Sequence, residues 1–205
     1  MGSKYKAQDS SIYIKDTDIP KNKLNISDSE TIHELEKELI EEAYQVFYDE
    51  LDEKTRFDEK YFIELHRRTF GDLYEWAGVY RSFNMSKGES RFCQGEYLKS
   101  SSEKIFNELA HTNYLKDYES KTKEELAQKI AYFKSELIAL HPFCELNGRI
   151  TRMFFDMIAI FNGYKYIDYS GVTPAQYIEA AIECVVYADS STMEQIILNG
   201  LIKVN

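Results

Sequence analysis

Helix-breaking residues are scarce in this chain: only three prolines and nine glycines occur among its 205 residues. Long helices are therefore permitted along most of the sequence, whereas a β-sandwich, which needs frequent turns, is disfavoured. The length is sufficient for one sizeable core and short for two. We expect a single domain over residues 1–205, with its core at about 20–200 and an irregular N-terminal segment at 1–19.

Apolar side chains recur every three or four positions through most of the chain, as expected for helices that bury one face. A first helix should follow a cap at Ser27 or Ser29 and run through Phe47, and a last one should open at Ser190 or Ser191. The other helices are expected at 59–74, 97–111, 123–140, 147–161 and from Pro174 onward.

The one extended pattern lies between residues 79 and 93, where two short runs flank Lys87-Gly-Glu-Ser90. A glycine turn between such runs predicts a β-hairpin. Pro142 disfavours helical backbone at the residue before it, so the helix at 123–140 should end near His141. We therefore predict an all-α bundle with a small hairpin on its surface.

The net charge of −10 argues against nucleic acid or an anionic membrane as a partner, because clustered Lys and Arg bind both. Cys93, Cys144 and Cys184 are widely spaced, which disfavours a disulfide framework or a cysteine zinc site. The first residues are polar, and we find no secretory signal and no apolar stretch long enough to cross a membrane. The cytoplasm is the expected compartment, while secretion as an effector stays open.

Residues 141–152 read His-Pro-Phe-Cys-Glu-Leu-Asn-Gly-Arg-Ile-Thr-Arg. Arg149 and Arg152 are three apart, so both should lie in the first turn of the helix at 147–161. A helix N-terminus carries partial positive charge and unpaired N–H groups, so it favours an anion over two cations. The amides of residues 145–148 and the two guanidinium groups together predict a phosphate-binding site.

Two more side chains in this segment suit chemistry on a phosphate. Glu145 could hold a magnesium ion that bridges phosphates, since such an ion needs only one or two carboxylates. His141 could act as a general base, because a histidine can take up a proton near neutral pH. Together these groups indicate phosphoryl or nucleotidyl transfer. The alternative is a structural loop histidine and two arginines that pair with acids elsewhere.

The same segment resembles the Fic motif, H-P-F-x-[D/E]-G-N-G-R-x-x-R, and matches it at every specified position except Leu146, where the family has glycine. Residues 65–78 resemble the family's upstream helix with its Trp-Ala-Gly ending, and residues 86–92 resemble its flap hairpin. Residues 22–26 are similar to the opening of Fic domains. The resemblance therefore covers roughly residues 20–200.

This resemblance implies the Fic fold and the transfer of AMP from ATP to a Ser, Thr or Tyr hydroxyl of a target protein. His141 would deprotonate that hydroxyl, and Glu145 would hold Mg²⁺. The flap residues Lys87 and Gly88 would bind the target's backbone as an added strand. The residues that would hold the nucleotide are Leu146, Asn147, Gly148, Arg149 and, at the γ-phosphate, Arg152. Doc-type relatives, which phosphorylate, carry a different loop after the phenylalanine.

A pattern in the last expected helix resembles the inhibitory motif of many Fic proteins, [S/T]-x-x-x-E-[G/N]. Ser190 and Glu194 match it, and Gln195 replaces the final Gly or Asn. The resemblance implies that Glu194 pairs with Arg152 and displaces the γ-phosphate. Ordinary capping of a helix by a serine and an acid in its first turn is the alternative interpretation.

Three hypotheses about function stay open: an autoinhibited adenylyltransferase, a non-catalytic Fic-like module that binds a nucleotide or a partner, and a Fic enzyme with another donor such as UTP, GTP or CDP-choline. Leu146 would lower activity if its position needs a positive φ or a close approach to phosphate, and would be tolerated if only its N–H is used. Retention of His141 together with Glu145 favours the enzyme. The expected partner is a protein substrate, and homo-oligomerisation stays open.

Overall fold

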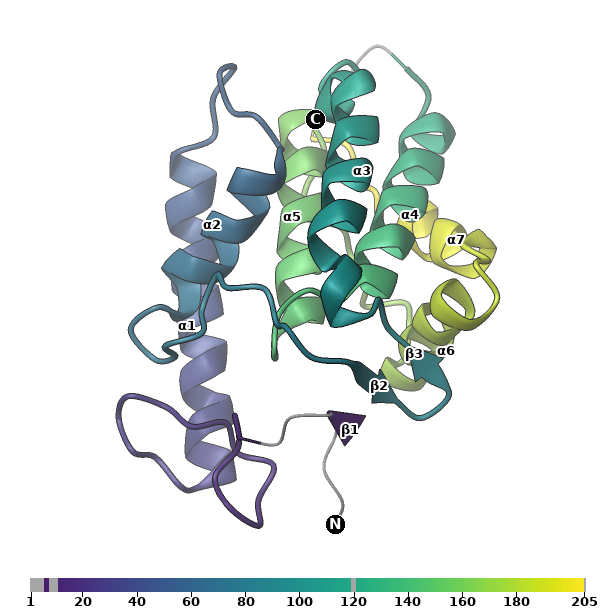
Figure 1. Cartoon of the computed structure of the whole chain (residues 1–205). Helices are drawn as coiled ribbons and strands as arrows, with labels where there is room; N and C mark the ends of the chain where they lie inside the picture. Colours follow the sequence, from purple (N-terminus) through teal and green to yellow (C-terminus); the bar gives the residue numbers. More distant parts are fainter. Residues whose placement is uncertain (1–5, 8–10, 119–120, 205) are drawn as a thin grey trace.

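The computed structural model describes residues 6–7, 11–118 and 121–204. Within them the chain folds as a helical bundle with a very small sheet, which confirms the predicted fold class (Figure 1). The helices are α1 (Ser29–Asp49), α2 (Glu59–Phe70), α3 (Leu98–His111), α4 (Lys123–Leu140), α5 (Asn147–Phe161), α6 (Pro174–Val186), α7 (Ser191–Gly200) and two short 3₁₀ helices, Gly95–Tyr97 and Asn113–Leu115. Residues 1–5 and 8–10 of the predicted irregular segment lie outside the described residues.

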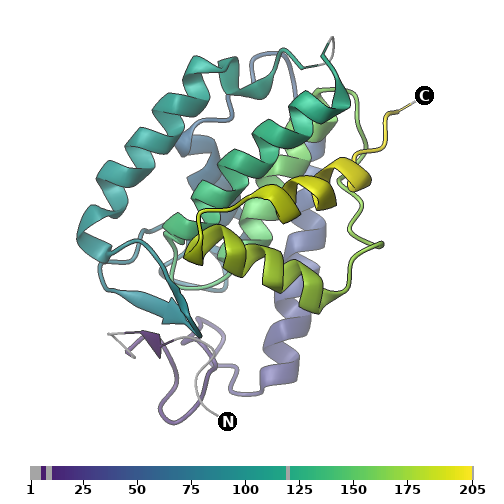
Figure 2. The ribbon, with the colours of Figure 1, turned by 90° about the vertical axis from the view of Figure 1, so that its right-hand side faces the viewer.

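Helix α5 forms the centre of the core. Its apolar stripe, Ile150, Met153, Phe154, Met157 and Ile158, is fully buried, as its helical spacing predicts. Helices α1, α2 and α4 contact α5, and Figure 2 shows α7 lying across α4 and α6. Burial of each such side chain contributes about 2 kcal/mol, so the packing also fixes the first turn of α5, which carries the motif.

The predicted hairpin is present as β2 (Met85–Lys87) and β3 (Ser90–Arg91), with Gly88 in the turn at a φ of 57°. A third strand, β1 (Lys6–Ala7), pairs antiparallel with the other edge of β2. Strand β1 lies within the segment that we expected to be irregular. Two residues are too few to show the alternation by which a strand is recognised in a sequence.

Helix α2 ends at Phe70, four residues before the end that the sequence predicts. Gly71 follows it, and turns then lead the backbone to Trp76 and Gly78. The apolar residues after Phe70 that extended the predicted helix, Leu73 and Tyr74, are nevertheless buried in the core. Apolar spacing alone could not separate a buried turn from a further helical turn.

Helix α4 ends at Leu140, as Pro142 predicts, and α5 begins at Asn147 as expected. The loop between them therefore joins the C-terminus of one core helix to the N-terminus of another. No helix in the described part of the chain combines the length and the apolar character needed to cross a membrane.

Candidate active site

His141 is fixed by the end of α4. Its backbone is left-handed, with φ 46° and ψ 58°, and its N–H still donates to the Leu137 carbonyl at 3.1 Å. The buried guanidinium of Arg81 donates to the carbonyls of His141 (2.9 Å) and Leu140 (3.3 Å). Helix C-termini expose unpaired carbonyls and partial negative charge, so a buried cation is well placed there.

Arg81 also ties this helix end to the hairpin. The same guanidinium donates to the carbonyls of Phe83 and Cys93, which flank β2 and β3. On the flap side, the ring of Phe92 stacks on the imidazole of His141, with centroids 3.8 Å apart and planes 12° apart. The histidine is therefore held from its backbone by one residue and on its ring face by another.

Leu146 lies at the turn into α5, in the left-handed region with φ 66° and ψ 8°. This position therefore does need a positive φ, which answers the question that the sequence left open. A left-handed residue with a side chain costs roughly 1–2 kcal/mol. The side chain of Leu146 is buried in the core, and that burial offsets the strain.

The side chain of Asn147 closes the motif loop. Its Nδ2 donates to the Phe143 carbonyl and its Oδ1 accepts from the Phe143 N–H, both at 2.8 Å. Because both ends of the amide are used, the side chain stabilises the loop and leaves the backbone N–H as the group that can meet a phosphate. Sequence reasoning had grouped Asn147 with the residues that would hold the nucleotide, without separating its side chain from its backbone.

The first turn of α5 offers an anion site. Helix geometry leaves the N–H groups of Asn147 and Gly148 without an intrahelical acceptor. Gly148 is open on its outer side: a Cβ built there would meet no atom within 4 Å. A phosphate could thus approach the backbone closely, as predicted for this segment.

The two motif arginines are held by different partners. An Nη of Arg149 lies 2.9 Å from Oε2 of Glu36 on α1, and Oε1 of this buried carboxylate accepts from the Tyr74 hydroxyl at 2.7 Å. The guanidinium of Arg152 instead lies over the rings of Tyr169 and Tyr177, at 4.7 and 4.8 Å. Arg149 faces the phosphate cavity, whereas Arg152 is not among the residues that line either cavity described below.

In the described part of the chain, the predicted ion pair between Glu194 and Arg152 is not formed. Helix α7 packs against α4 and α6, and the two tyrosines already flank the Arg152 guanidinium. Ser190 precedes α7 and its carbonyl accepts the Glu194 N–H at 2.8 Å, while its side chain makes no capping hydrogen bond.

Glu145, the expected metal ligand, is buried and oriented by two distant residues. Its Oε1 accepts from the Tyr13 hydroxyl at 2.7 Å, and its carbonyl lies 3.2 Å from Nε2 of His66. The Gly78 N–H donates to Nδ1 of His66, which leaves the proton on Nε2. Burial lowers the pKa of His66 to about 4, so this histidine is a neutral part of the core.

A magnesium ion fits this arrangement if phosphate oxygens and water supply most of its ligands. Among the described residues, no group of three or more His, Cys, Asp or Glu side chains could hold a metal ion. A bridging Mg²⁺ needs only one or two carboxylates besides phosphate and water. Glu145 can supply one at the edge of the phosphate cavity.

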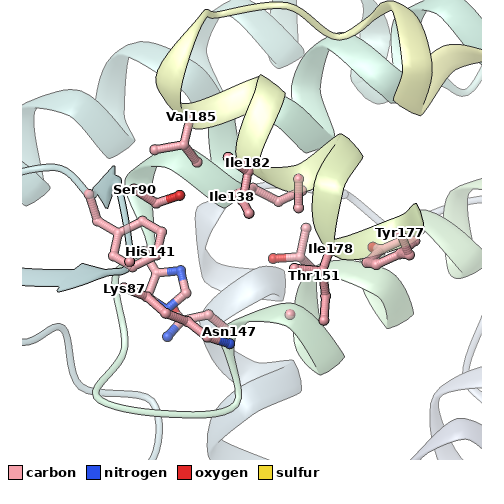
Figure 3. Close-up of a pocket in the computed structure, with 14 residues that line it drawn as sticks. Lys87, Ser90, Ile138, His141, Asn147, Thr151, Tyr177, Ile178, Ile182 and Val185 are labelled. Atoms are coloured by element: carbon pink, nitrogen blue, oxygen red, sulfur yellow. The ribbon is translucent and has the colours of Figure 1, made fainter. Parts of the chain in front are cut away.

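Two cavities meet at the motif. A polar one of about 170 Å³ is bordered by Glu36, Glu145, Arg149 and the flap residue Lys87. A larger one of about 410 Å³ is bordered by His141, Lys87, Gly88 and the apolar face of α6 (Figure 3). Lys87, Asn147 and Gly148 border both. The structure thus brings His141, Glu145, the α5 amides and the flap together, whereas Ser190 and Glu194 lie at the start of α7 and border neither cavity.

Sequence reasoning missed four supporting residues: Tyr13, Glu36, His66 as a partner of the loop, and Arg81. Each acts on the motif loop or Arg149 from a distant part of the chain.

Comparison with known proteins agrees with this geometry. The model of the Fic/DOC family matches residues 56–159, from just before α2 to near the end of α5. The chain belongs to the Fic/DOC family. The resemblance found in the motif is thereby confirmed.

The relatives of this Fic/DOC chain include named enzymes. It is 32% identical over 179 residues to the probable protein adenylyltransferase y4lH of Sinorhizobium fredii, covering 87% of this chain and 90% of that protein. It is 34% identical over 146 residues to the protein adenylyltransferase VbhT of Bartonella schoenbuchensis, covering 71% of this chain but 30% of that protein.

Solved structures confirm the fold of this Fic/DOC chain. The BepC protein of Bartonella tribocorum, a VirB-translocated effector with bound AMPPNP, superposes with a TM-score of 0.81 at 24% identity, covering 95% of this chain and 98% of that one. The N-terminal Fic domain of an effector from Bartonella sp. AR 15-3 gives a TM-score of 0.80 at 22% identity, with 93% and 91% covered.

Proposed function

We propose that this chain is a protein adenylyltransferase, which transfers AMP from ATP to a Ser, Thr or Tyr hydroxyl of another protein. The observation that carries the proposal is one cavity bordered by His141, by the flap residue Lys87 and by the first turn of α5. A proton acceptor, a docking surface for a target and anion-binding amides thus lie around one space. The names of the curated relatives support the same reaction.

In this reaction His141 takes the proton from the target hydroxyl, whose oxygen attacks the α-phosphorus of ATP. The new P–O bond forms as the bond from the α-phosphorus to the bridging oxygen breaks, and pyrophosphate leaves. The amides of Asn147 and Gly148 and the guanidinium of Arg149 stabilise negative charge on the phosphate oxygens. Arg152 would serve the γ-phosphate after moving away from its two tyrosines.

Magnesium bound with the nucleotide would neutralise phosphate charge and favour departure of pyrophosphate. Glu145, whose Oε1 accepts a hydrogen bond from the Tyr13 hydroxyl, would hold this ion. The AMPPNP bound to BepC is an ATP analogue, which supports ATP as the donor.

The flap binds the target by strand addition in this proposal. Strand β2 is already paired on both edges, with β1 and β3, so a target strand near Lys87 and Gly88 would replace β1 or pair with β3.

The cytoplasm is the proposed compartment, and delivery as an effector is the alternative. Inhibition by the segment Ser190–Glu194, in which Glu194 would pair with Arg152 and displace the γ-phosphate, stays a hypothesis. It requires Arg152 to turn toward α7.

One observation favours a second candidate, a non-catalytic module. Leu146 occupies a left-handed position in the loop that must cradle phosphate, and strain there could misplace the neighbouring amides. Another nucleotide in place of ATP is the third candidate, since the motif does not select the base.

The deciding experiment is incubation of the protein with α-labelled ATP, Mg²⁺ and a cell lysate. Two proteins are compared under these conditions, the unaltered chain and the His141→Ala variant. We expect label on protein with the unaltered chain and a loss of at least about 100-fold in the variant. Label that survives His141→Ala would contradict the role of His141. Absence of label with ATP, GTP, UTP and CDP-choline, despite tight ATP binding, would favour the non-catalytic module.

The proposed inhibition by Glu194 is tested in the same assay with the Glu194→Gly variant. An increase in label would support inhibition by Glu194, and equal label in the two proteins would remove it.

A further inference from the structure

One end of the larger cavity is apolar and has no role in the transfer step described above. Ile138 of α4 and Ile178, Ile182 and Val185 of α6 form an aliphatic wall there, and Figure 3 shows this wall across the cavity from the groups that do the chemistry. The charged and reactive groups, Lys87, His141 and Asn147, gather at the opposite end. The cavity therefore changes from polar to apolar along its length.

Thr151 places one polar group within this apolar end. Its side chain is only 1% exposed, and its Oγ1 has no hydrogen-bond partner among the described residues. A threonine inside a helix can bond back to a carbonyl one turn earlier, and this hydroxyl does not. In Figure 3 its oxygen points into the cavity. A buried hydroxyl without a partner is destabilising, so its position calls for a partner that arrives from outside.

The occupant follows from continuity with the phosphate site. Lys87, Asn147 and Gly148 border both the polar cavity and this one. A molecule whose phosphates bind at the first turn of α5 would therefore extend its uncharged part along the aliphatic wall. A planar base with hydrogen-bonding edges suits walls that are apolar apart from a few hydroxyl groups.

We propose that Thr151 is a base-binding residue for the nucleotide donor, and that its hydroxyl forms a hydrogen bond with the edge of a purine. The proposal rests on the proposed function, because it assigns a residue to the same nucleotide. Ser90 of β3, which is also buried, directs a second hydroxyl into the cavity from the flap side (Figure 3).

This mode of recognition has a consequence for the choice of donor. A hydroxyl both donates and accepts a hydrogen bond, so it can meet the amino group of adenine or the carbonyl of guanine. The aliphatic side chains of α6 add no group that separates the two. ATP and GTP analogues should therefore bind within about tenfold of each other.

The test measures binding, so that it does not depend on a target protein. Calorimetry would compare the unaltered chain with Thr151→Val, using α,β-methylene ATP, α,β-methylene GTP and inorganic tripolyphosphate, each with Mg²⁺. The methylene bridge blocks transfer, and tripolyphosphate carries the phosphates without a base. We expect Thr151→Val to raise Kd for both analogues by about 3- to 10-fold and to leave Kd for tripolyphosphate unchanged. Its Tm without ligand should be unchanged or higher, since the variant removes an unpaired buried hydroxyl.

Thr69→Val is the matched control. Thr69 is buried on α2, and its hydroxyl donates to the Leu65 carbonyl at 2.6 Å. The same atoms are exchanged there away from both cavities, so Kd should not change for any of the three ligands.

The possible failures can be told apart. An equal loss of affinity for tripolyphosphate, or no loss for either analogue, would overturn the role of Thr151. A preference of the unaltered chain for one purine by more than about 100-fold would contradict recognition by a hydroxyl alone. Failure of the unaltered chain to bind any of the three ligands would instead overturn the proposed function.

Discussion

At the scale of single residues, Leu146 combines two opposed contributions to stability. Its left-handed backbone is unfavourable for any residue that has a Cβ, whereas its side chain is buried in the core. Comparing two replacements of Leu146 therefore separates the energetic cost of the backbone strain from the gain due to side-chain burial.

We expect Leu146→Gly to be more stable than Leu146→Ala by about 1 kcal/mol. Both variants lose the buried side chain, but only glycine removes the strain of the positive φ. In an ordinary helix the order is reversed, with alanine more stable than glycine by up to about 1 kcal/mol. Urea unfolding of the two variants measures the difference, and a more stable alanine variant would show that the position carries no strain.

At the scale of elements, Arg81 joins the C-terminus of α4 to the hairpin. Its guanidinium reaches carbonyls on both sides of the junction, from Leu140 and His141 on one side and from Phe83 and Cys93 on the other. A planar group with five N–H donors can serve four such acceptors, whereas an ammonium group offers three donors from a single atom.

Arg81→Lys should therefore lower the free energy of unfolding by about 2–3 kcal/mol, because buried carbonyls lose their partners. AMP transfer should fall as well, since the backbone of His141 is no longer fixed. The matched control is Arg56→Lys, an exposed exchange that should leave stability nearly unchanged. Equal stability of the Arg81 and Arg56 variants would remove Arg81 from this role.

At the scale of the whole molecule, His66 makes stability depend on pH. It bridges the Gly78 N–H and the Glu145 carbonyl, and burial lowers its pKa to about 4 from an ordinary 6.5. The unfolded chain therefore binds a proton between these pH values that the folded chain does not bind. Stability is fully present above pH 6.5 and falls as the pH drops toward 4.

The expected loss between pH 6.5 and 4 is on the order of 3 kcal/mol from this residue. Urea unfolding at several pH values, with EDTA present, would measure it against His66→Gln, which cannot take up the proton. The variant should lose less stability than the unaltered chain over this range, whatever its stability at pH 7. Parallel curves for the two proteins would assign the acid sensitivity to other groups.

The elements around the motif could be predicted from the sequence because their signals are local. Pro142 marked the end of α4, and the apolar stripe from Ile150 marked α5. The contacts of the motif could not be predicted in this way. Arg81, Glu36 and Tyr13 lie 60, 113 and 132 positions from their partners, and no periodicity links residues so far apart.

The conformation of Leu146 was beyond the sequence for a different reason. The motif identified the position, but a residue that replaces glycine does not reveal whether the backbone has kept its unusual angle. Strand β1 and the early end of α2 were missed because short or buried turns carry little pattern of their own.

The bond between Tyr13 and Glu145 bears on how a smaller version of this protein should be cut. The family match begins at residue 56, and a fragment trimmed to it would retain every letter of the motif. It would nevertheless lose the hydroxyl that orients Glu145, the Glu36 carboxylate that holds Arg149, and the whole of α6. A truncation series for engineering should therefore preserve the chain from Tyr13 through α7, because α7 also packs into the core. A fusion partner is better joined at the C-terminal end than at the N-terminal end, which carries Tyr13.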